Sequence, residues 1–172
     1  LDGTEVDTRS EEDGHHDFAV MPDGGITFIE YDVLDGEEGD RLVEISPDGE
    51  ETVIWSVWDD FTSEGGSGGI GTTFSHFNAI DYYEDEDAYH VSSLGFGGLF
   101  KVDRGSGELQ WTMGGDESDF YLPGGDTDLF DKNHQFHRLD ETMLVFVNSD
   151  EDTACSEARE YAYEGTGGEV EL

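Results

Sequence analysis

Three histidines, His16, His76 and His134, recur at nearly equal intervals along the chain. Each stands at the start of a short run of apolar and polar residues. An imidazole can act as a nucleophile, carry a proton near neutral pH, or bind a metal ion. The spacing therefore predicts a histidine site if the fold brings the three units together.

Each histidine opens a unit with the same series of predicted strands. The second strands are ITFIEYD, AYHVSS and MLVFVNS, and the third strands are RLVEIS, GLFKVD and EAREYAY. The fourth strands are TVIWSVW, ELQWTMGG and EVEL, each preceded by a turn rich in Gly, Asp or Glu. Four short strands per unit, without helical periodicity, predict an all-β protein built as a β-propeller. A β-sandwich with an accidental near-repeat is the alternative.

The predicted blades are the units at about 14–62, 74–116 and 132–172, within one partial propeller domain spanning 1–172. A longer insertion, 121–133, precedes the third unit. The innermost strands of a propeller converge on its axis, so histidines from separate units can face one point. Propellers have about four to eight blades, so three cannot close a ring. We expect the remaining blades, or a second copy of the chain, to complete it.

The charge balance excludes several classes of partner. Lys and Arg total 7 and Asp and Glu total 44, giving a formal net charge of −37. A nucleic-acid binder needs basic surface, and an anionic membrane would repel this chain. Surplus acid spread along a folded chain is typical of a protein adapted to high salt, where screening removes the repulsion. No apolar run is long enough to span a bilayer, and Cys155 has no partner for an internal disulfide.

The second unit carries a motif that resembles the arylsulfate sulfotransferase family. Between His76 and Gly115 the chain has a His-x-Asn strand start, a Ser-Ser strand end, the turn KVDRGSGELQW and then Gly-Gly. The first unit, with HHDF and RLVEISPDG, is similar to the family's His-His-Asp blade, and the third is similar to its last His-led blade. The resemblance spans about residues 14–172. It implies a six-bladed propeller, of which this chain holds about three four-stranded blades, in a secreted, periplasmic or cell-surface protein.

The resemblance also implies an activity. Family members transfer a sulfuryl group from an aryl sulfate donor to a phenolic acceptor through a sulfated histidine, without a cofactor. His134 matches the nucleophilic histidine, and His16 and His76 match the two that assist it. Covalent catalysis of this kind divides one difficult transfer into two easier ones. Neighbouring histidines can stabilise the developing charge and deliver protons.

The resemblance predicts substrate-binding residues as well. Asn78 and Ser93 belong to the matching motif. The family usually has an arginine directly after the Ser-Ser pair, where it grips the sulfate, but this chain has Leu94. A bidentate guanidinium is hard to replace. Arg138 and His137, next to His134, are the predicted substitutes.

Three alternatives remain open. The recurring histidines can be structural, each binding a backbone group of the neighbouring blade. Alternatively, they can bind a divalent metal on the axis, but no tight ligand spacing supports a metal and none is expected. Its ligands would be His15, His16, Asp17, His76 and His134. Finally, the chain can be a non-catalytic extracellular binding or scaffold module that kept the fold and lost the arginine, because fold does not decide function.

Overall fold

The computed structural model describes residues 13–62, 74–130, 132–148 and 155–172. Apart from one 3-10 turn, η1 (Val57–Asp59), the regular structure in these ranges consists of strands. The strands are β1 (Gly14–Val20), β2 (Ile26–Leu34), β3 (Glu37–Ile45), β4 (Glu51–Ser56), β5 (Phe77–Tyr83), β6 (Ala88–Ser93), β7 (Gly98–Asp103), β8 (Leu109–Met113), β9 (Phe120–Tyr121), β10 (Asn133–Leu139), β11 (Thr142–Val147), β12 (Glu157–Ala162) and β13 (Gly168–Glu169). The predicted all-β class is confirmed.

Two four-stranded antiparallel sheets come first in the chain. The first has the order β1-β2-β3-β4 and the second β5-β6-β7-β8, so each is a meander of consecutive strands. This is the strand order predicted for the first two units. Short hairpins suit such sheets, because an antiparallel pair needs only a tight turn.

The third sheet differs from its prediction. It has three strands, β10-β11-β12, and the segment EVEL does not form the expected fourth strand of this sheet. Instead, β13 pairs in parallel with β9, which lies within the segment before the third unit, and Glu171 makes only an isolated bridge to Ala162. Backbone donors explain this choice. Gly168 N donates to Asp119 O and Val170 N to Tyr121 O, and this pairing buries the Val170 side chain completely.

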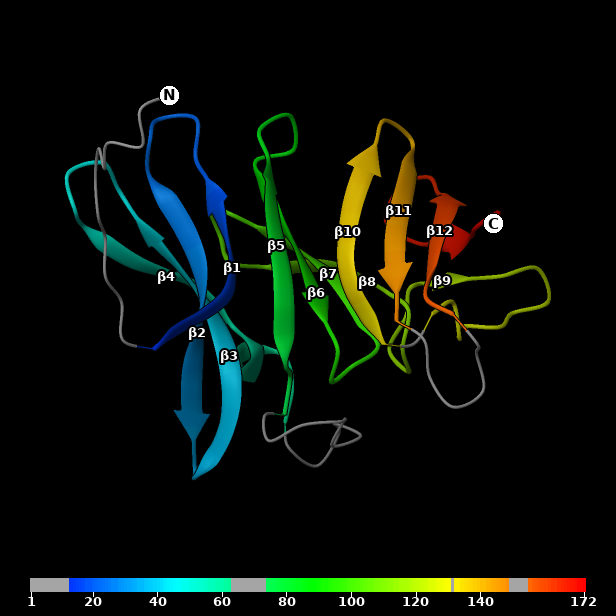
Figure 1. Ribbon diagram of the computed structural model, residues 1–172, viewed down its shortest axis with the longest axis horizontal. Coiled ribbons are helices and arrows are strands. Elements are labelled where there is room, and N and C mark those ends of the chain that lie inside the picture. The colour runs from blue at the N-terminus through cyan, green and yellow to red at the C-terminus, as the bar shows by residue number, and fades with distance from the viewer. Residues whose placement is uncertain (1–12, 63–73, 131, 149–154) are drawn as a thin grey trace.

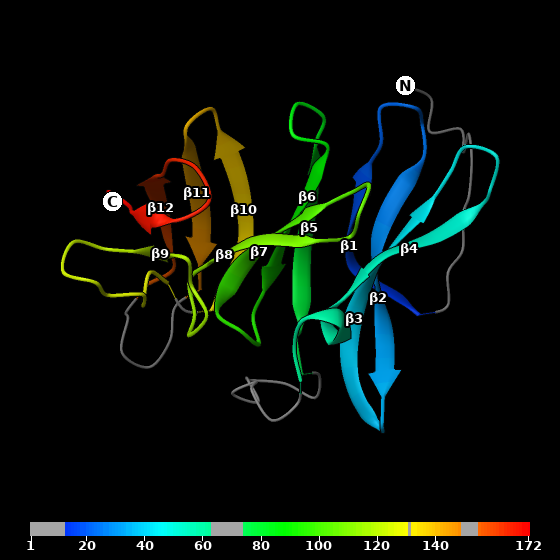
Figure 2. The ribbon, with the colours of Figure 1, turned by 180° about the vertical axis from the view of Figure 1, so that it is seen from behind.

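The three sheets lie side by side, with their first strands as neighbours. Strand β1 packs beside β5, and β5 beside β10. In Figure 1 these strands, in dark blue, green and yellow, all begin below the middle of the molecule and run upward. Seen from behind, β4 and β8 lie on the opposite side of the molecule (Figure 2). The sheets of the described residues form no closed ring.

Two apolar cores lie between the sheets and hold them together. The core between the first and second sheets includes Ile29, Leu42, Trp55, Phe77, Tyr89 and Phe100. The core between the second and third includes Leu99, Trp111, Phe120, Phe136, Met143 and Tyr161. Trp55 in β4 and Trp111 in β8 fill matching places, since each stands beside the register shift of its strand pair. Trp55 stacks on Phe77, and Trp111 meets Phe120 edge to face. Burial of large aromatic side chains is therefore the main force joining the sheets.

The insertion before the third unit packs into this second core. Leu129 and Phe130 are buried, and the Leu129 carbonyl accepts hydrogen bonds from the Tyr161 hydroxyl and Arg159 Nη1. Phe130 lies against Gly114, whose φ of 84° and closeness to the ring explain the glycine at that position. The segment thus closes the gap between the second and third sheets.

The KVDRGSGELQW turn joins the first and second sheets. Arg104 Nε and Nη2 donate to the Glu44 carboxylate at 2.8 and 2.6 Å, and the Tyr89 hydroxyl donates to the same carboxylate at 2.6 Å. Asp103 Oδ1 accepts from Ser106 N and Oγ, which fixes the turn. The arginine of this motif therefore pairs with the neighbouring sheet.

No helix in the described residues is long and apolar enough to cross a membrane.

Candidate functional site

The starts of β1, β5 and β10 bring the three recurring histidines together. His16 lies in β1, His76 directly precedes β5, and His134 is the second residue of β10. The ring centroids of His16 and His76 are 5.2 Å apart. His134 is close enough to act electrostatically on both, because it contributes to lowering the pKa of each. We refer to His15, His16, His76 and His134 as the histidine cluster.

Bulges in the sheets place the side chains of this cluster. The register of β1 shifts between His15 and Phe18, and that of β10 shifts between Asn133 and Gln135, so His16 and His134 lie in bulges. A bulge redirects a side chain away from the regular alternation of a strand and is common beside active sites. The backbone adds to this effect, because His16 and His76 have φ angles of 59° and 46°. Non-glycine residues in the left-handed region carry strain that often marks a functional site.

The register also corrects the alignment of the units. In β5 the shift lies between Phe77 and Ala79, so Asn78 occupies the bulge position that His134 occupies in β10. The sequence separation from Asn78 to His134 equals that from Trp55 to Trp111, which fill matching places in successive units. His76 therefore enters the cluster from an earlier position in its unit than His134 does.

Burial and like charge keep two of the histidines neutral. Burial is the largest cause that lowers the pKa of His16, and His15 and His76 lower it further, while Asp40 raises it. Burial also lowers the pKa of His76, again with Asp40 acting in the opposite direction. Both pKa values therefore lie below the ordinary value for histidine, so at pH 7 both imidazoles carry a free lone pair.

Asn78 lies directly beside His134. Its amide group is buried, and Nδ2 donates to the Asn133 carbonyl at 2.9 Å and lies 3.4 Å from Nδ1 of His134. Because an amide NH2 group only donates, this contact favours the tautomer of His134 whose lone pair is on Nδ1. The His134 side chain itself is exposed, and this is its one hydrogen-bond contact among the described residues.

The other two predicted substrate-binding residues are engaged elsewhere. Ser93 is fully buried, its hydroxyl donates to the Ser75 carbonyl at 2.5 Å, and it accepts from Phe96 N. It therefore holds the β6–β7 turn against the segment that enters β5. The residue after Ser93 is held as well, since Leu94 N donates to the His76 carbonyl at 3.0 Å. Position 94 thus lies next to the cluster.

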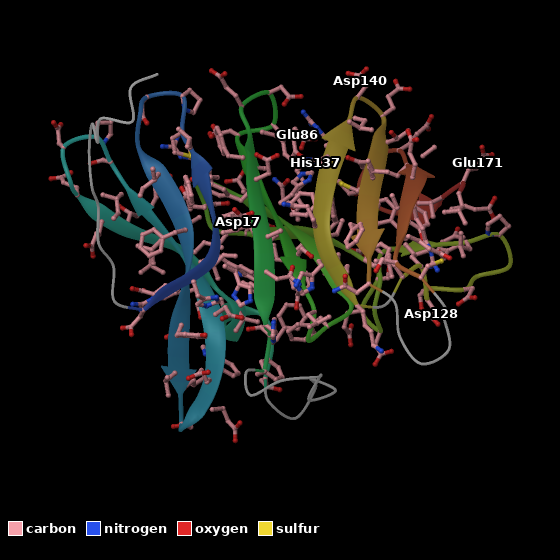
Figure 3. The ribbon with its side chains drawn as sticks, viewed as in Figure 1. Asp17, Glu86, Asp128, His137, Asp140 and Glu171 are labelled. Atoms are coloured by element: carbon pink, nitrogen blue, oxygen red, sulfur yellow. The ribbon has the colours of Figure 1, made fainter. Side chains whose placement is uncertain are left out.

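Arg138 lies at the other end of β10 from His134. Its guanidinium is 2.5 Å from Asp85 and 3.1 Å from Glu86, and it covers the ring of Tyr83. Its Cα is roughly 13 Å from that of His134 at the rise of a β-strand. Figure 3 shows Glu86 near the upper end of the view, away from the strand starts. Arg138 is therefore not brought together with the histidine cluster.

The remaining two histidines are also outside the cluster. His90 is fully buried in β6, and its Nε2 contacts Glu86 at 3.1 Å. Lys101 and Arg138 bind the same carboxylate, and hydrogen bonds from His90 and Lys101 lower the pKa of Glu86 to about 2. His137 is exposed near this end of the molecule (Figure 3). His90 is therefore a packed residue of β6, and His137 is an exposed residue of β10.

Asp40 is a site residue that sequence reasoning missed. It is fully buried in β3, where its Oδ2 accepts from the Ser75 hydroxyl at 2.5 Å and from Phe77 N at 2.8 Å. Its Oδ1 lies 3.0 Å from His15 Nε2. The alternation of β3 carried a signal, because Asp40 shares a face with the buried Leu42. An acid on the inward face of a strand is expected to have a specific partner.

The metal-binding alternative finds no support in the geometry. No three His, Cys, Asp or Glu side chains within 13–62, 74–130, 132–148 and 155–172 are arranged to hold a metal ion. Asp17, one of the suggested ligands, instead accepts a hydrogen bond from Ile80 N and so ties β1 to β5. Figure 3 shows it between these strands.

An all-β fold with imidazoles gathered at neighbouring strand starts agrees with the class of transferase that the sequence motifs indicated. A family model described as Arylsulfotransferase (ASST) matches residues 4–164. The chain belongs to the arylsulfotransferase family, and its general function is arylsulfotransferase-like. No curated protein matches the chain.

Proposed function

We propose that the chain transfers a sulfuryl group from an aryl sulfate to a phenolic acceptor, with His134 as the residue that carries the group. The observation that supports this best is the setting of His134. It is an exposed imidazole in a bulge, next to Asn78 and near two histidines whose pKa values are lowered. A structural histidine would be buried and bonded to backbone, as the first alternative requires.

The proposed reaction has two displacements at sulfur. In the first, the Nδ1 lone pair of His134 gives up its long contact with Asn78 and forms an N–S bond while the S–O bond to the aryl group breaks, and the phenolate leaves. His16 or His76 gives the phenolate its proton from the minor fraction of molecules in which that imidazole is protonated, and a lowered pKa makes this form the stronger acid. In the second, the neutral form of that histidine takes the proton of the acceptor phenol, whose oxygen forms a new S–O bond as the N–S bond breaks. The site returns to its starting state without a cofactor.

The three sheets are proposed to be blades of a propeller. The neighbouring first strands β1, β5 and β10 favour this arrangement, since innermost strands meet at the axis of a propeller. The outer face of the first sheet exposes Phe18, Val20 and Val53, which favours a further sheet packed against it. Further blades or a second copy would cover this face. We place the protein outside the cytoplasm, in a secreted, periplasmic or cell-surface location, and expect no nucleic-acid partner.

Trapping the covalent intermediate tests the proposal. The full chain is incubated briefly with p-nitrophenyl sulfate in molar KCl, quenched at alkaline pH and digested. Mass spectrometry should find a peptide that contains His134 and is heavier by one sulfuryl group, together with release of p-nitrophenolate. A sulfated peptide lacking His134, with turnover intact, would contradict the assignment.

A second function is favoured by one specific observation. No guanidinium reaches the cluster from the position of the family's arginine or from the predicted substitute, because position 94 is leucine and Arg138 is paired with Asp85 and Glu86. An oxyanion site without a bidentate donor loses affinity and orientation. The chain would then act as a non-catalytic binding or scaffold module.

Replacing Leu94 by arginine separates the two functions. The backbone N–H of Leu94 donates a hydrogen bond to the His76 carbonyl, so a long side chain at position 94 would begin next to the cluster. Leu94→Arg should raise kcat/KM for p-nitrophenyl sulfate by about tenfold or more, since a charge-assisted bidentate contact is worth on the order of 1.5–3 kcal/mol. Leu94→Lys, which adds the charge without the fork, is the control and should gain less. If both variants and the natural chain are inactive, the binding-module function is supported.

A further inference from the structure

We infer that Asp40 and His15 form a positioning relay that sets the tautomer of His16 and takes up the proton that His16 acquires. The inference deepens the proposed function, because it assigns roles to two residues that do not react with the substrate. Its physical basis is a continuous row of polar groups from the buried Asp40 carboxylate to the ring of His16.

The first link joins Asp40 to His15. Asp40 Oδ1 and His15 Nε2 are 3.0 Å apart, Asp40 is fully buried, and the His15 side chain is nearly so. The two atoms are at ion-pair distance without the alignment of a straight hydrogen bond, and neither has another hydrogen-bond partner within the described part of the chain. A lone pair on Nε2 would face the carboxylate and be repelled. Nε2 of His15 therefore carries a proton, and in the neutral ring Nδ1 has the lone pair.

The second link joins His15 to His16. Their Nδ1 atoms are 2.7 Å apart, the distance of a short hydrogen bond. Since Nδ1 of His15 is the acceptor, Nδ1 of His16 must be the donor. The lone pair of neutral His16 is then on Nε2. Asp40 thus determines, through His15, which nitrogen of His16 is available as a base.

Neighbouring contacts make the relay rigid. The ring of His15 stacks on Tyr31 at a centroid distance of 4.0 Å. The second oxygen of Asp40 accepts from Ser75 and from Phe77 N, which lies directly after His76. The same carboxylate therefore fixes the position of His15 in the first sheet and the entry of β5 in the second. This double attachment explains why a charged residue is tolerated on an inward face of β3.

The relay gives His16 a place to send a proton. When Nε2 of His16 accepts the proton of the phenol, its Nδ1–H bond breaks as a new N–H bond forms on Nδ1 of His15. The positive charge then resides on His15, opposite the Asp40 carboxylate. Without the relay, the charge would remain on His16 beside His76 and His134. Like charges there are unfavourable, as the lowered pKa of His16 indicates.

Tautomers measured by NMR test the relay independently of sulfuryl transfer. In the full chain with 15N-labelled histidine at pH 8, long-range 1H–15N spectra should show His16 protonated on Nδ1 and His15 protonated on Nε2. Asp40→Asn presents an amide donor to His15, so both tautomers should reverse. His15→Gln can donate to Asp40 and accept from His16, so it should keep His16 protonated on Nδ1. His16 protonated on Nε2 in the unmodified chain would overturn the inference.

Titration and kinetics complete the test. Asp40 raises the pKa of His16 and of His76, so in Asp40→Asn both pKa values should fall further below the ordinary value. If the protein transfers sulfuryl groups, kcat should fall about 10–100-fold in Asp40→Asn and in His15→Gln with little change in KM, the usual cost of losing such support. Unchanged pKa values in a folded Asp40→Asn variant would contradict the relay. An inactive chain with the expected tautomers would count against the proposed function alone.

Discussion

His134→Ala should lower the rate of sulfuryl transfer by about a thousandfold or more, because the reaction loses the atom to which the sulfur binds. The fold should be preserved. The His134 side chain is exposed, and its hydrogen-bond contact within the described residues is the 3.4 Å approach to Asn78. The melting temperature should therefore change by only a few degrees. The measurements are release of p-nitrophenolate at saturating phenol and a thermal melt of each variant.

The same strand provides the control for this experiment. His137→Ala removes an exposed imidazole from β10 at a distance from the cluster, and it should leave the rate nearly unchanged. His16→Ala and His76→Ala should lower the rate by about 10²–10⁴-fold, the range of general acid–base catalysis. Turnover that survives in His134→Ala would end the assignment of the nucleophile.

Much of the fold could be predicted because its signals are local. Alternation lies within a single strand, Gly and Asp mark the turns inside each unit, and each of the first two units has a tryptophan in its fourth strand, Trp55 or Trp111. They yielded the all-β class and the strand order of the first two sheets. The third sheet could not be completed in this way. Pairing of Gly168 with Phe120 joins segments that are far apart in the sequence, and backbone donors of this kind leave no pattern in the side chains.

The site was predictable in part for a similar reason. The spacing of His16, His76 and His134 located the strand starts, and the fold brings them together. Spacing alone did not reveal that the bulge at Asn78 matches the one at His134. Sequence proximity was also misleading for Arg138. It follows His134 by only four residues, but an extended strand places these two residues far apart in space. Asp40 lies in a different strand from the histidine that it faces, so its role depends on a contact between strands.

Stability should rise steeply with salt concentration. The chain has 44 acidic and 7 basic residues, and its net charge of −37 opposes compaction. Several of the cations are already paired across sheets in partly buried contacts, such as Arg104 with Glu44 and Arg138 with Glu86. Those pairs are screened little by salt, whereas repulsion among the surplus surface carboxylates is screened strongly once the Debye length falls to about 3 Å at 1 M. The balance of the two effects therefore favours the folded state at high salt.

The melting temperature should increase by about 10 °C or more between about 0.1 M and 3 M KCl, since each kcal/mol moves a chain of this size by about 2–4 °C. Differential scanning calorimetry measures it. Salt also strengthens burial of apolar surface in general, so a charge-reduced variant is needed to isolate screening. Substituting the exposed acids Glu37, Glu51 and Glu164 by glutamine removes three charges, and it should raise the melting temperature at low salt while reducing the slope with salt. Equal slopes in the two proteins would assign the effect to burial instead of charge. A flat or falling melting temperature would contradict adaptation to high salt.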